Sequence, residues 1–128
     1  MKRTPYALLV VRALWELARY DLVNVVFGFR RVYRDVERQR VDSRACRAET
    51  ALICQAVCLA ACFYCKPALC LQRSVAATRL LRKYGVNGRL VIGYRPAPFF
   101  SHAWVEVAGR VVNDSPAYKD RLHVLCTF

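Results

Sequence analysis

The chain has 128 residues, 56% of them hydrophobic and 12% aromatic, a composition that excludes a disordered chain and predicts a folded protein. This length suits one domain around one core and is too short for two. With 21 Lys and Arg against 9 Asp and Glu, the net charge of +12 favours an acidic partner, without choosing among nucleic acid, a membrane surface and an acidic peptide.

The cysteines and the N-terminus indicate a cytoplasmic protein with reduced thiols. Seven cysteines cannot all pair with one another within the chain. The opening MKRTPYALLVVRALWELARYDL does not resemble a signal peptide, because Arg12 and Glu16 interrupt its apolar region. No apolar run reaches the ~20 residues that a membrane-spanning helix needs.

The first third of the sequence predicts helices. Apolar residues are dense from Tyr6 to Val26 and predict a helix with a broad buried stripe. Peripheral membrane contact is the less favoured alternative, because interfacial helices carry several basic residues on a clear polar face. The next segment predicts a solvated helix face, or alternatively a surface for an acidic peptide or phosphate. Its arginines are Arg30, Arg31, Arg34, Arg38, Arg40, Arg44 and Arg47.

The remaining elements predict an α+β fold. Residues 49–65 form an apolar helix that ends before Pro67, and Pro67 suits the first turn of a second helix that Gly85 closes. The second half is rich in β-branched and aromatic residues and predicts strands. These strands cover residues 88–94, 102–108, 110–114 and 121–128. Helices followed by strands favour N-terminal helices packed on a small antiparallel sheet.

Four cysteines in the 49–65 helix have a spacing that needs an interpretation. Cys58, Cys62 and Cys65 match the C-x3-C-x2-C pattern of a radical-dependent iron–sulfur site, and Cys54 extends it by four residues. Such ligands lie on a loop after a strand, whereas these have helical spacing in an apolar background. We therefore expect structural packing. The same interpretation applies to Cys46 and Cys126.

Cys70 is the candidate nucleophile. It follows Pro67 in the opening turn of a helix, where unpaired N–H groups and the helix dipole stabilise a thiolate. His102 and Asp114 follow in the second half, so the chain order is Cys, His, Asp. In this arrangement Cys70 attacks an acyl carbon, His102 transfers the proton and Asp114 orients the imidazole. The Cys70 N–H is a candidate oxyanion donor.

The strand pattern sets a condition on Asp114. Side chains alternate along HAWVEV, so His102 shares a face with Trp104 and Glu106. A two-residue loop before Arg110 places Asp114 opposite Ala103, on the wrong face. A three-residue loop, 108–110, or a bulge places Asp114 opposite Trp104 and diagonal to His102. We therefore expect the longer loop, with Gly109 supplying the positive φ.

Trp104 and Glu106 are the candidate substrate-binding residues. Trp104 either shields the site from water or covers the sheet, and Glu106 either holds a basic group or is solvated. His123 lies in the last predicted strand without a comparable neighbourhood, so we interpret it as structural.

The sequence resembles the transglutaminase-like cysteine peptidases that remove leader peptides in lasso-peptide biosynthesis. The resemblance rests on CLQRSVAATRLLRKYG, LVIGY and HAWVEVAGRVVND, with the apolar first helix and FGFRRVYR. It implies a transglutaminase/papain-like core, with a helical part at 1–48 and a catalytic core at 49–128 in one domain. It also implies Cys70, His102 and Asp114 as the catalytic residues, with no cofactor or metal.

The resemblance further implies the partners. The substrate would be a lasso precursor peptide, cut between leader and core. Because the chain begins with its helical part, leader recognition is expected from a separate protein, and the lasso cyclase is a further expected partner. Two alternatives stay open. The same triad serves a transglutaminase-like acyltransferase, and the charge suits a basic nucleic-acid-binding module, although most aromatics fall in apolar runs.

Overall fold

The computed structural model describes residues 4–42 and 48–128, and it confirms the predicted α+β fold. Arg44, Cys46 and Arg47 lie outside the described residues. The helices are α1 (Tyr6–Phe27), α2 (Phe29–Arg38), α3 (Thr50–Phe63), α4 (Cys70–Lys83) and α5 (Ala117–Arg121). The strands are β1 (Gly88–Pro96), β2 (Phe99–Val107), β3 (Arg110–Val111) and β4 (His123–Thr127). They form an antiparallel sheet in the order β3-β2-β1-β4.

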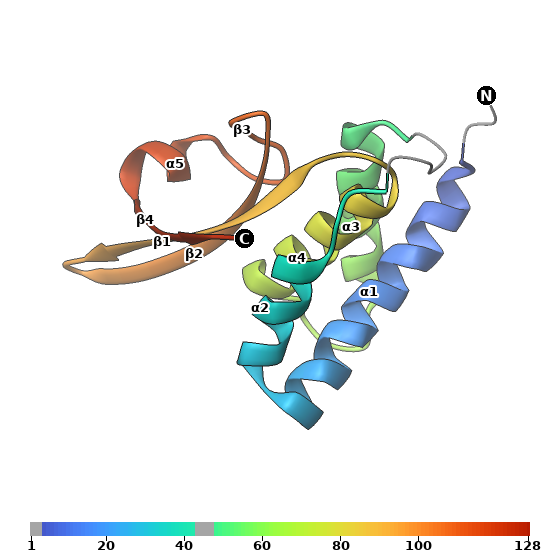
Figure 1. The fold of residues 1–128 in the computed structure, drawn as a ribbon, viewed down its shortest axis with the longest axis horizontal. Coiled ribbons are helices and arrows are strands. Elements are labelled where there is room, and N and C mark those ends of the chain that lie inside the picture. Colours follow the sequence, from blue (N-terminus) through green and yellow to red (C-terminus); the bar gives the residue numbers. More distant parts are fainter. Residues whose placement is uncertain (1–3, 43–47) are drawn as a thin grey trace.

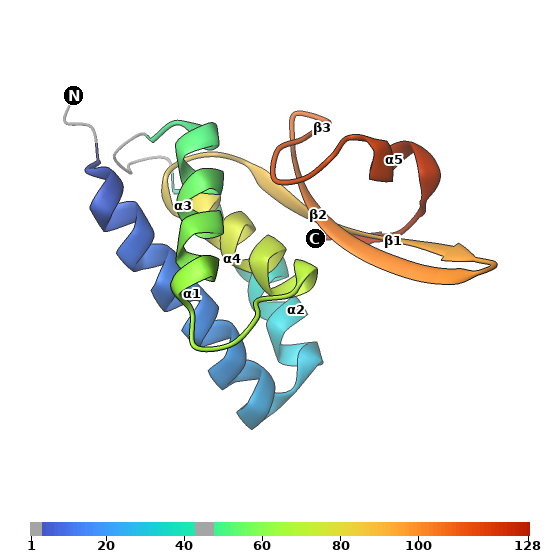
Figure 2. The same ribbon diagram turned by 180° about the vertical axis from the view of Figure 1, so that it is seen from behind.

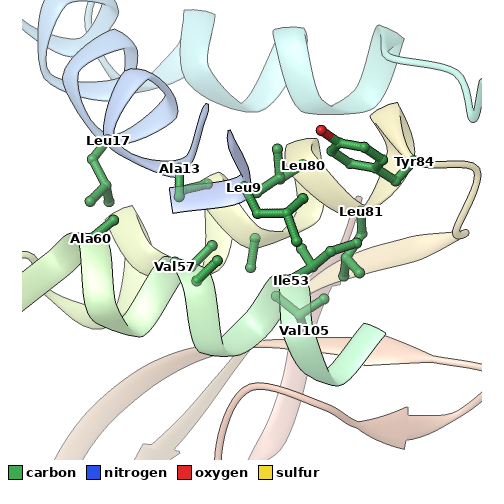
Figure 3. Packing of buried hydrophobic residues seen from close by; sticks show 13 residues of the cluster. Leu9, Ala13, Leu17, Ile53, Val57, Ala60, Leu80, Leu81, Tyr84 and Val105 are labelled. Atoms are coloured by element: carbon green, nitrogen blue, oxygen red, sulfur yellow. The ribbon is translucent and has the colours of Figure 1, made fainter. Parts of the chain in front are cut away.

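The helices α1 to α4 gather on one side of the molecule, and the sheet with α5 lies on the other (Figures 1 and 2). Helix α4 joins the two halves, because it contacts the three preceding helices as well as β1 and β2. The main core contains Leu9 and Leu17 from α1, Ile53 from α3, Leu80 from α4 and Val105 from β2, all fully buried (Figure 3). The helix that begins at Cys70 is therefore held on all sides.

Helix α1 has two apolar faces, and only one of them is buried. The packed face carries Glu16 as well as apolar side chains, and this carboxylate is 1% exposed. Arg79 and Lys83 of α4 lie 2.8 and 2.9 Å from its oxygens and compensate the buried charge. The predicted buried stripe is thus present, but it covers only one face of the helix. Its opposite face exposes Leu8, Val11, Trp15, Leu22, Val25 and Val26.

No helix in residues 4–42 or 48–128 combines the length and the hydropathy needed to cross a bilayer.

The arginine-rich helix α2 forms only part of the expected ion pairs. Asp35 accepts hydrogen bonds from Arg19 of α1 at 2.9 Å and from Arg31 at 3.1 Å. Burial opposes ionisation of Asp35, but these two guanidinium groups outweigh it and lower the pKa of the carboxyl below its usual value. Arg30 and Arg34 are exposed, and neither has a carboxylate partner among the described residues.

Several predicted boundaries are wrong. Pro67 is not in the first helical turn, because α4 begins three residues later, at Cys70. The strand predicted at 110–114 is only two residues long. The segment 121–128 is not entirely a strand, because its first residue belongs to α5, a short helix that periodicity did not indicate.

Candidate active site

Cys70 is the first residue of α4, and its side chain is partly exposed. The preceding residue, Leu69, has an extended backbone and no side-chain hydrogen bond to the helix end. The first N–H groups of a helix have no partner within it. The structure therefore confirms that Cys70 lies in the opening turn of a helix, and its backbone N–H points out of the helix start.

His102 lies in the middle of β2, directly opposite Gly93 of β1. The ring of Tyr118, from α5, stacks on the imidazole with centroids 4.0 Å apart. The side chain of His102 is 11% exposed, so its ring is largely shielded while one edge reaches solvent. Strand β2 and helix α5 together fix the plane of the imidazole.

Asp114 meets His102 directly. Its Oδ2 lies 2.6 Å from His102 Nε2, and its Oδ1 accepts the Ser115 N–H at 2.7 Å. An ionised carboxylate only accepts hydrogen bonds, so this contact places the imidazole proton on Nε2. Nδ1 is then the ring nitrogen that is left to exchange a proton with another group.

The expectation about the preceding loop is wrong. Val107 pairs with Arg110, so the loop is the two-residue turn Ala108–Gly109, and both residues have positive φ, 52° and 79°. A regular ladder beyond that turn would indeed carry Asp114 to the wrong face. The ladder stops instead: β3 has only two residues, and the chain leaves the sheet before Asp114.

Two pockets meet at Cys70 and His102. One has a volume of about 170 Å³ and is polar, lined also by Arg73, Ser74, Asn113 and Asp114. The other, about 130 Å³, is lined also by Tyr33, Leu71, Ile92, Ser101 and Ala103. The Cys70 thiol and the imidazole are not hydrogen-bonded to each other, although both are in the described chain and both line the two pockets. A substrate that spans this position contacts a polar surface on one side and a more apolar one on the other.

Neither of the two predicted substrate-binding residues lines the pockets at Cys70 and His102, although Glu106 is half-buried and lines a separate pocket of about 300 Å³. Trp104 is fully buried against Val91 and Leu122. Glu106 accepts a hydrogen bond from Trp104 Nε1 at 3.3 Å and pairs with Lys119 at 2.8 Å. These contacts hold α5, and with it Tyr118, against the sheet. His123 is exposed on β4 and lines neither pocket.

The other cysteines differ from one another in their surroundings. Cys54 is buried, and burial raises the pKa of its thiol to about 11. Cys58 accepts a hydrogen bond from Arg73 at 3.1 Å. Cys62 and Cys65 are exposed, so the expected packing role is wrong for these two. Across the described ranges, no three Cys, His, Asp or Glu side chains are grouped so that they could hold a metal ion.

Cys126 is half-buried in β4, and burial raises the pKa of its thiol.

Three residues around the site were not predicted from the sequence. Asn113 precedes Asp114 where a strand ends, a position where asparagine side chains often bond to nearby backbone. Ser74 lies four residues after Cys70 and so on the same face of the helix, a signal that was available. Tyr118 had no sequence signal, because it reaches His102 only through the placement of α5.

Comparison with known proteins assigns the chain to a family. A sequence profile described as the transglutaminase-like superfamily matches residues 7–127. The microcin J25-processing protein McjB of Escherichia coli is 48% identical over 56 residues, a stretch that covers 44% of this chain and 27% of that protein. No solved structure matches the chain significantly. Because the profile covers nearly the whole sequence, the chain belongs to the transglutaminase-like superfamily.

Proposed function

We propose that this protein is a cysteine peptidase that removes the leader from a ribosomally made lasso-peptide precursor, with Cys70, His102 and Asp114 as its catalytic triad. The observation that carries the proposal is the 2.6 Å hydrogen bond between His102 and Asp114 beside a cysteine at a helix start. The choice of substrate is supported by the similarity to McjB, whose name describes the processing of microcin J25.

The reaction begins with transfer of the Cys70 proton to Nδ1 of His102, because Asp114 holds the proton on Nε2. The thiolate sulfur attacks the carbonyl carbon of the scissile peptide bond and forms a tetrahedral intermediate. As the C–N bond breaks, the imidazolium returns the proton to the leaving nitrogen, which becomes the free N-terminus of the core peptide. Water, deprotonated by His102, then attacks the thioester carbon; the C–S bond breaks, the imidazolium returns the proton to the Cys70 sulfur, and the leader leaves as a carboxylic acid.

Charge that develops on the carbonyl oxygen needs hydrogen-bond donors. The backbone N–H of Cys70 is the first candidate, because the uncapped start of α4 leaves it without an intrahelical acceptor. Asp114 stabilises the imidazolium that forms in the first step, and its second oxygen is held by the Ser115 N–H, so the carboxylate stays in place during the reaction.

The partners follow from the same proposal. The substrate is a lasso precursor peptide, a separate leader-recognition protein presents it, and the lasso cyclase receives the core peptide. The matched stretch covers 27% of the length of McjB.

Peptide mass measured after incubation tests this function. The wild type, Cys70→Ala and a control, Cys62→Ala, are each mixed with a precursor peptide and its leader-binding protein. Cys62 is exposed on α3 and lines neither pocket, so its replacement leaves cleavage intact. We expect two fragments, leader acid and core amine, from the wild type and the control only.

The mass of the leader fragment also tests the alternative chemistry. A transglutaminase-like acyltransferase passes the acyl group to an amine, so the leader carries an amide adduct instead of a free acid. Intact precursor with the wild type, in the presence of a leader-binding protein shown to bind, contradicts both forms of the proposal.

A further inference from the structure

We propose that Asn113 is a positioning residue, anchored by Ser74, which ends β3 and thereby brings Asp114 against His102. This inference rests on the proposed triad and adds a reason for its geometry. The two-residue turn requires such a device, because a regular continuation of β3 would place Asp114 opposite Ala103. The observed 2.6 Å contact with His102 needs the ladder to be broken before that point.

The hydrogen bonds show where the ladder breaks. In a regular antiparallel pair, Val105 and Val112 would exchange two backbone hydrogen bonds. Only one is present: the Val112 N–H donates to the Val105 carbonyl at 3.0 Å. The Val105 N–H donates instead to the side-chain oxygen of Asn113, at 2.7 Å. The side chain thus takes the position of the Val112 carbonyl in the ladder, and the backbone is free to leave the sheet.

The other end of the same amide is anchored in the core. Asn113 Nδ2 donates to Ser74 Oγ at 3.1 Å, and Ser74 Oγ donates to the carbonyl of Ala103 at 3.1 Å. Ser74 is 1% exposed, so its hydroxyl has little access to water that would replace a lost partner, whereas Asn113 is half-buried at the edge of the polar pocket. The network fixes the orientation of the amide, since only its oxygen can accept the Val105 N–H.

This network connects the three elements that carry the triad. Ser74 is one helical turn after Cys70 in α4, Ala103 is next to His102 in β2, and Asn113 is next to Asp114. One side chain therefore relates the nucleophile, the base and the acid to one another. Without it, the Val105 N–H is free to pair with the Val112 carbonyl, β3 lengthens, and the Asp114 carboxylate is drawn away from the imidazole.

Kinetics of three variants test the role. Asn113→Ala and Ser74→Ala each remove one member of the network, while Asn87→Ala replaces an exposed asparagine that lines neither triad pocket. Misplacement of a catalytic group by about 1 Å costs about 100-fold in rate, so we expect kcat to fall about 10- to 100-fold in both network variants, with KM changed by less than about threefold. Asn87→Ala keeps the wild-type kcat.

A double-mutant cycle separates positioning from a general loss of structure. In a chain that already carries Asp114→Ala, Asn113→Ala should lower the residual kcat by less than about twofold, because it acts through the absent carboxylate. An equal loss in both backgrounds overturns the proposal, as does a kcat within threefold of wild type in both network variants.

A measurement without substrate keeps this inference distinct from the proposed function. The low-field proton NMR signal of the His102 Nε2–H, assigned by its loss in Asp114→Ala, reports the contact with the carboxylate directly. We expect it in the wild type and Asn87→Ala, and expect it lost in Asn113→Ala and Ser74→Ala while the thermal unfolding transition stays cooperative. If the signal persists in both variants, the positioning role is contradicted, even if the wild type cleaves the precursor. If it is lost as expected but no precursor is cleaved, only the proposed function fails.

Discussion

At the scale of single residues, Gly93 has a packing role next to the site. It lies opposite His102, and a Cβ at this position would lie 2.6 Å from the buried ring of Trp104 and 3.0 Å from Leu122. No real side chain tolerates such distances, so Gly93 is what allows the indole to lie across β1. Trp104 in turn is hydrogen-bonded to Glu106, which holds α5 and Tyr118 over the imidazole.

Gly93→Ala should therefore destabilise the protein and disturb the site. Overpacking a core of this kind costs about 1–3 kcal/mol, which urea unfolding measures, and the displaced indole should change the near-UV circular dichroism. Gly28→Ala is the control for the spectrum: its φ of +82° and ψ of 176° add backbone strain that also lowers stability, but the new Cβ meets no packed atom within 4 Å, so the near-UV spectrum should stay unchanged. A Gly93→Ala protein with wild-type stability and an unchanged near-UV spectrum would contradict this account.

The placement of the three candidate residues, one at a helix start and two in contact, was predictable from the sequence, and their catalytic role stays a prediction. Cys70 follows a proline near a helix start, and His102 and Asp114 follow in order on the strand region. The turn between them was predicted wrongly. The period-2 pattern assumes that a strand continues regularly, and it does not show that the side chain of Asn113 competes with the backbone for the Val105 N–H.

At the scale of secondary-structure elements, Asp21 joins α1 to the connection between α3 and α4. Its carboxylate accepts hydrogen bonds from Tyr64 and from Gln72, the latter at 3.0 Å, and Lys66 lies 2.8 Å away. Burial opposes ionisation, but the hydrogen bonds from Lys66, Tyr64 and Gln72 outweigh it and lower the pKa of Asp21. Burial and the neighbouring carboxylate raise the pKa of Tyr64. The start of α4 at Cys70 is thus tied to α1.

Asp21→Asn should destabilise the protein in a pH-dependent way. A carboxyl whose pKa is lower in the folded state stabilises that state above its unfolded pKa, and the effect is lost as pH falls through the folded pKa. Because the Asp21 side chain is 20% exposed, we expect Asp21→Asn to lower the free energy of unfolding by about 1–2 kcal/mol at pH 7. The difference from wild type should stay constant down to about pH 5 and shrink below about pH 4.

Urea unfolding at several pH values measures this difference. Asp120→Asn is the control, because Asp120 is exposed on α5 and has no ion-pair partner among the described residues. A difference between Asp21→Asn and wild type that is absent at pH 7, or that grows as the pH falls below 4, would show that the network does not stabilise the ionised carboxylate.

Element types were predictable where a long segment keeps one character between clear end signals, as in α1, α3, α4 and β1. The helix α5 was not, because its five residues are too few for a periodic signal and its position depends on the Lys119–Glu106 ion pair. Burial within α1 was only partly predictable. Apolar side chains occupy nearly its whole circumference, so the sequence alone does not distinguish the face that packs on α3 and α4 from the exposed one.

At the scale of the whole molecule, the net charge of +12 includes arginines that have no carboxylate partner within residues 4–42 and 48–128. Arg30 and Arg34 lie on α2, on the helical side of the molecule (Figure 1), whereas Arg31 is held by Asp35. A charge that no internal partner neutralises is available to an acidic partner and attracts it over a distance set by the ionic strength. Of the predicted binding surface, the structure therefore leaves Arg30 and Arg34 accessible, and Arg38 and Arg40, at and just after the end of α2, are exposed as well.

Reversing both charges should weaken binding of the precursor with its leader-recognition protein. Two exposed ion pairs contribute roughly 0.4–2 kcal/mol together, so in Arg30→Glu/Arg34→Glu we expect the Kd from fluorescence anisotropy to rise about 2- to 30-fold at low salt. Raising the salt concentration should narrow the gap to wild type, because screening removes the same attraction. Arg31 is left unchanged, since its replacement would also disturb Asp35 and α2.

A control with the same net charge separates a local surface from a general effect. Arg89 and Arg110 are exposed on β1 and β3, and their reversal also changes the net charge from +12 to +8, since each exchange removes two charges. If α2 contacts the acidic partner, the sheet variant binds nearly as tightly as wild type. Equal weakening in both variants would mean that the partner senses total charge only, and unchanged binding in both would remove the basic surface from the proposed recognition of the leader.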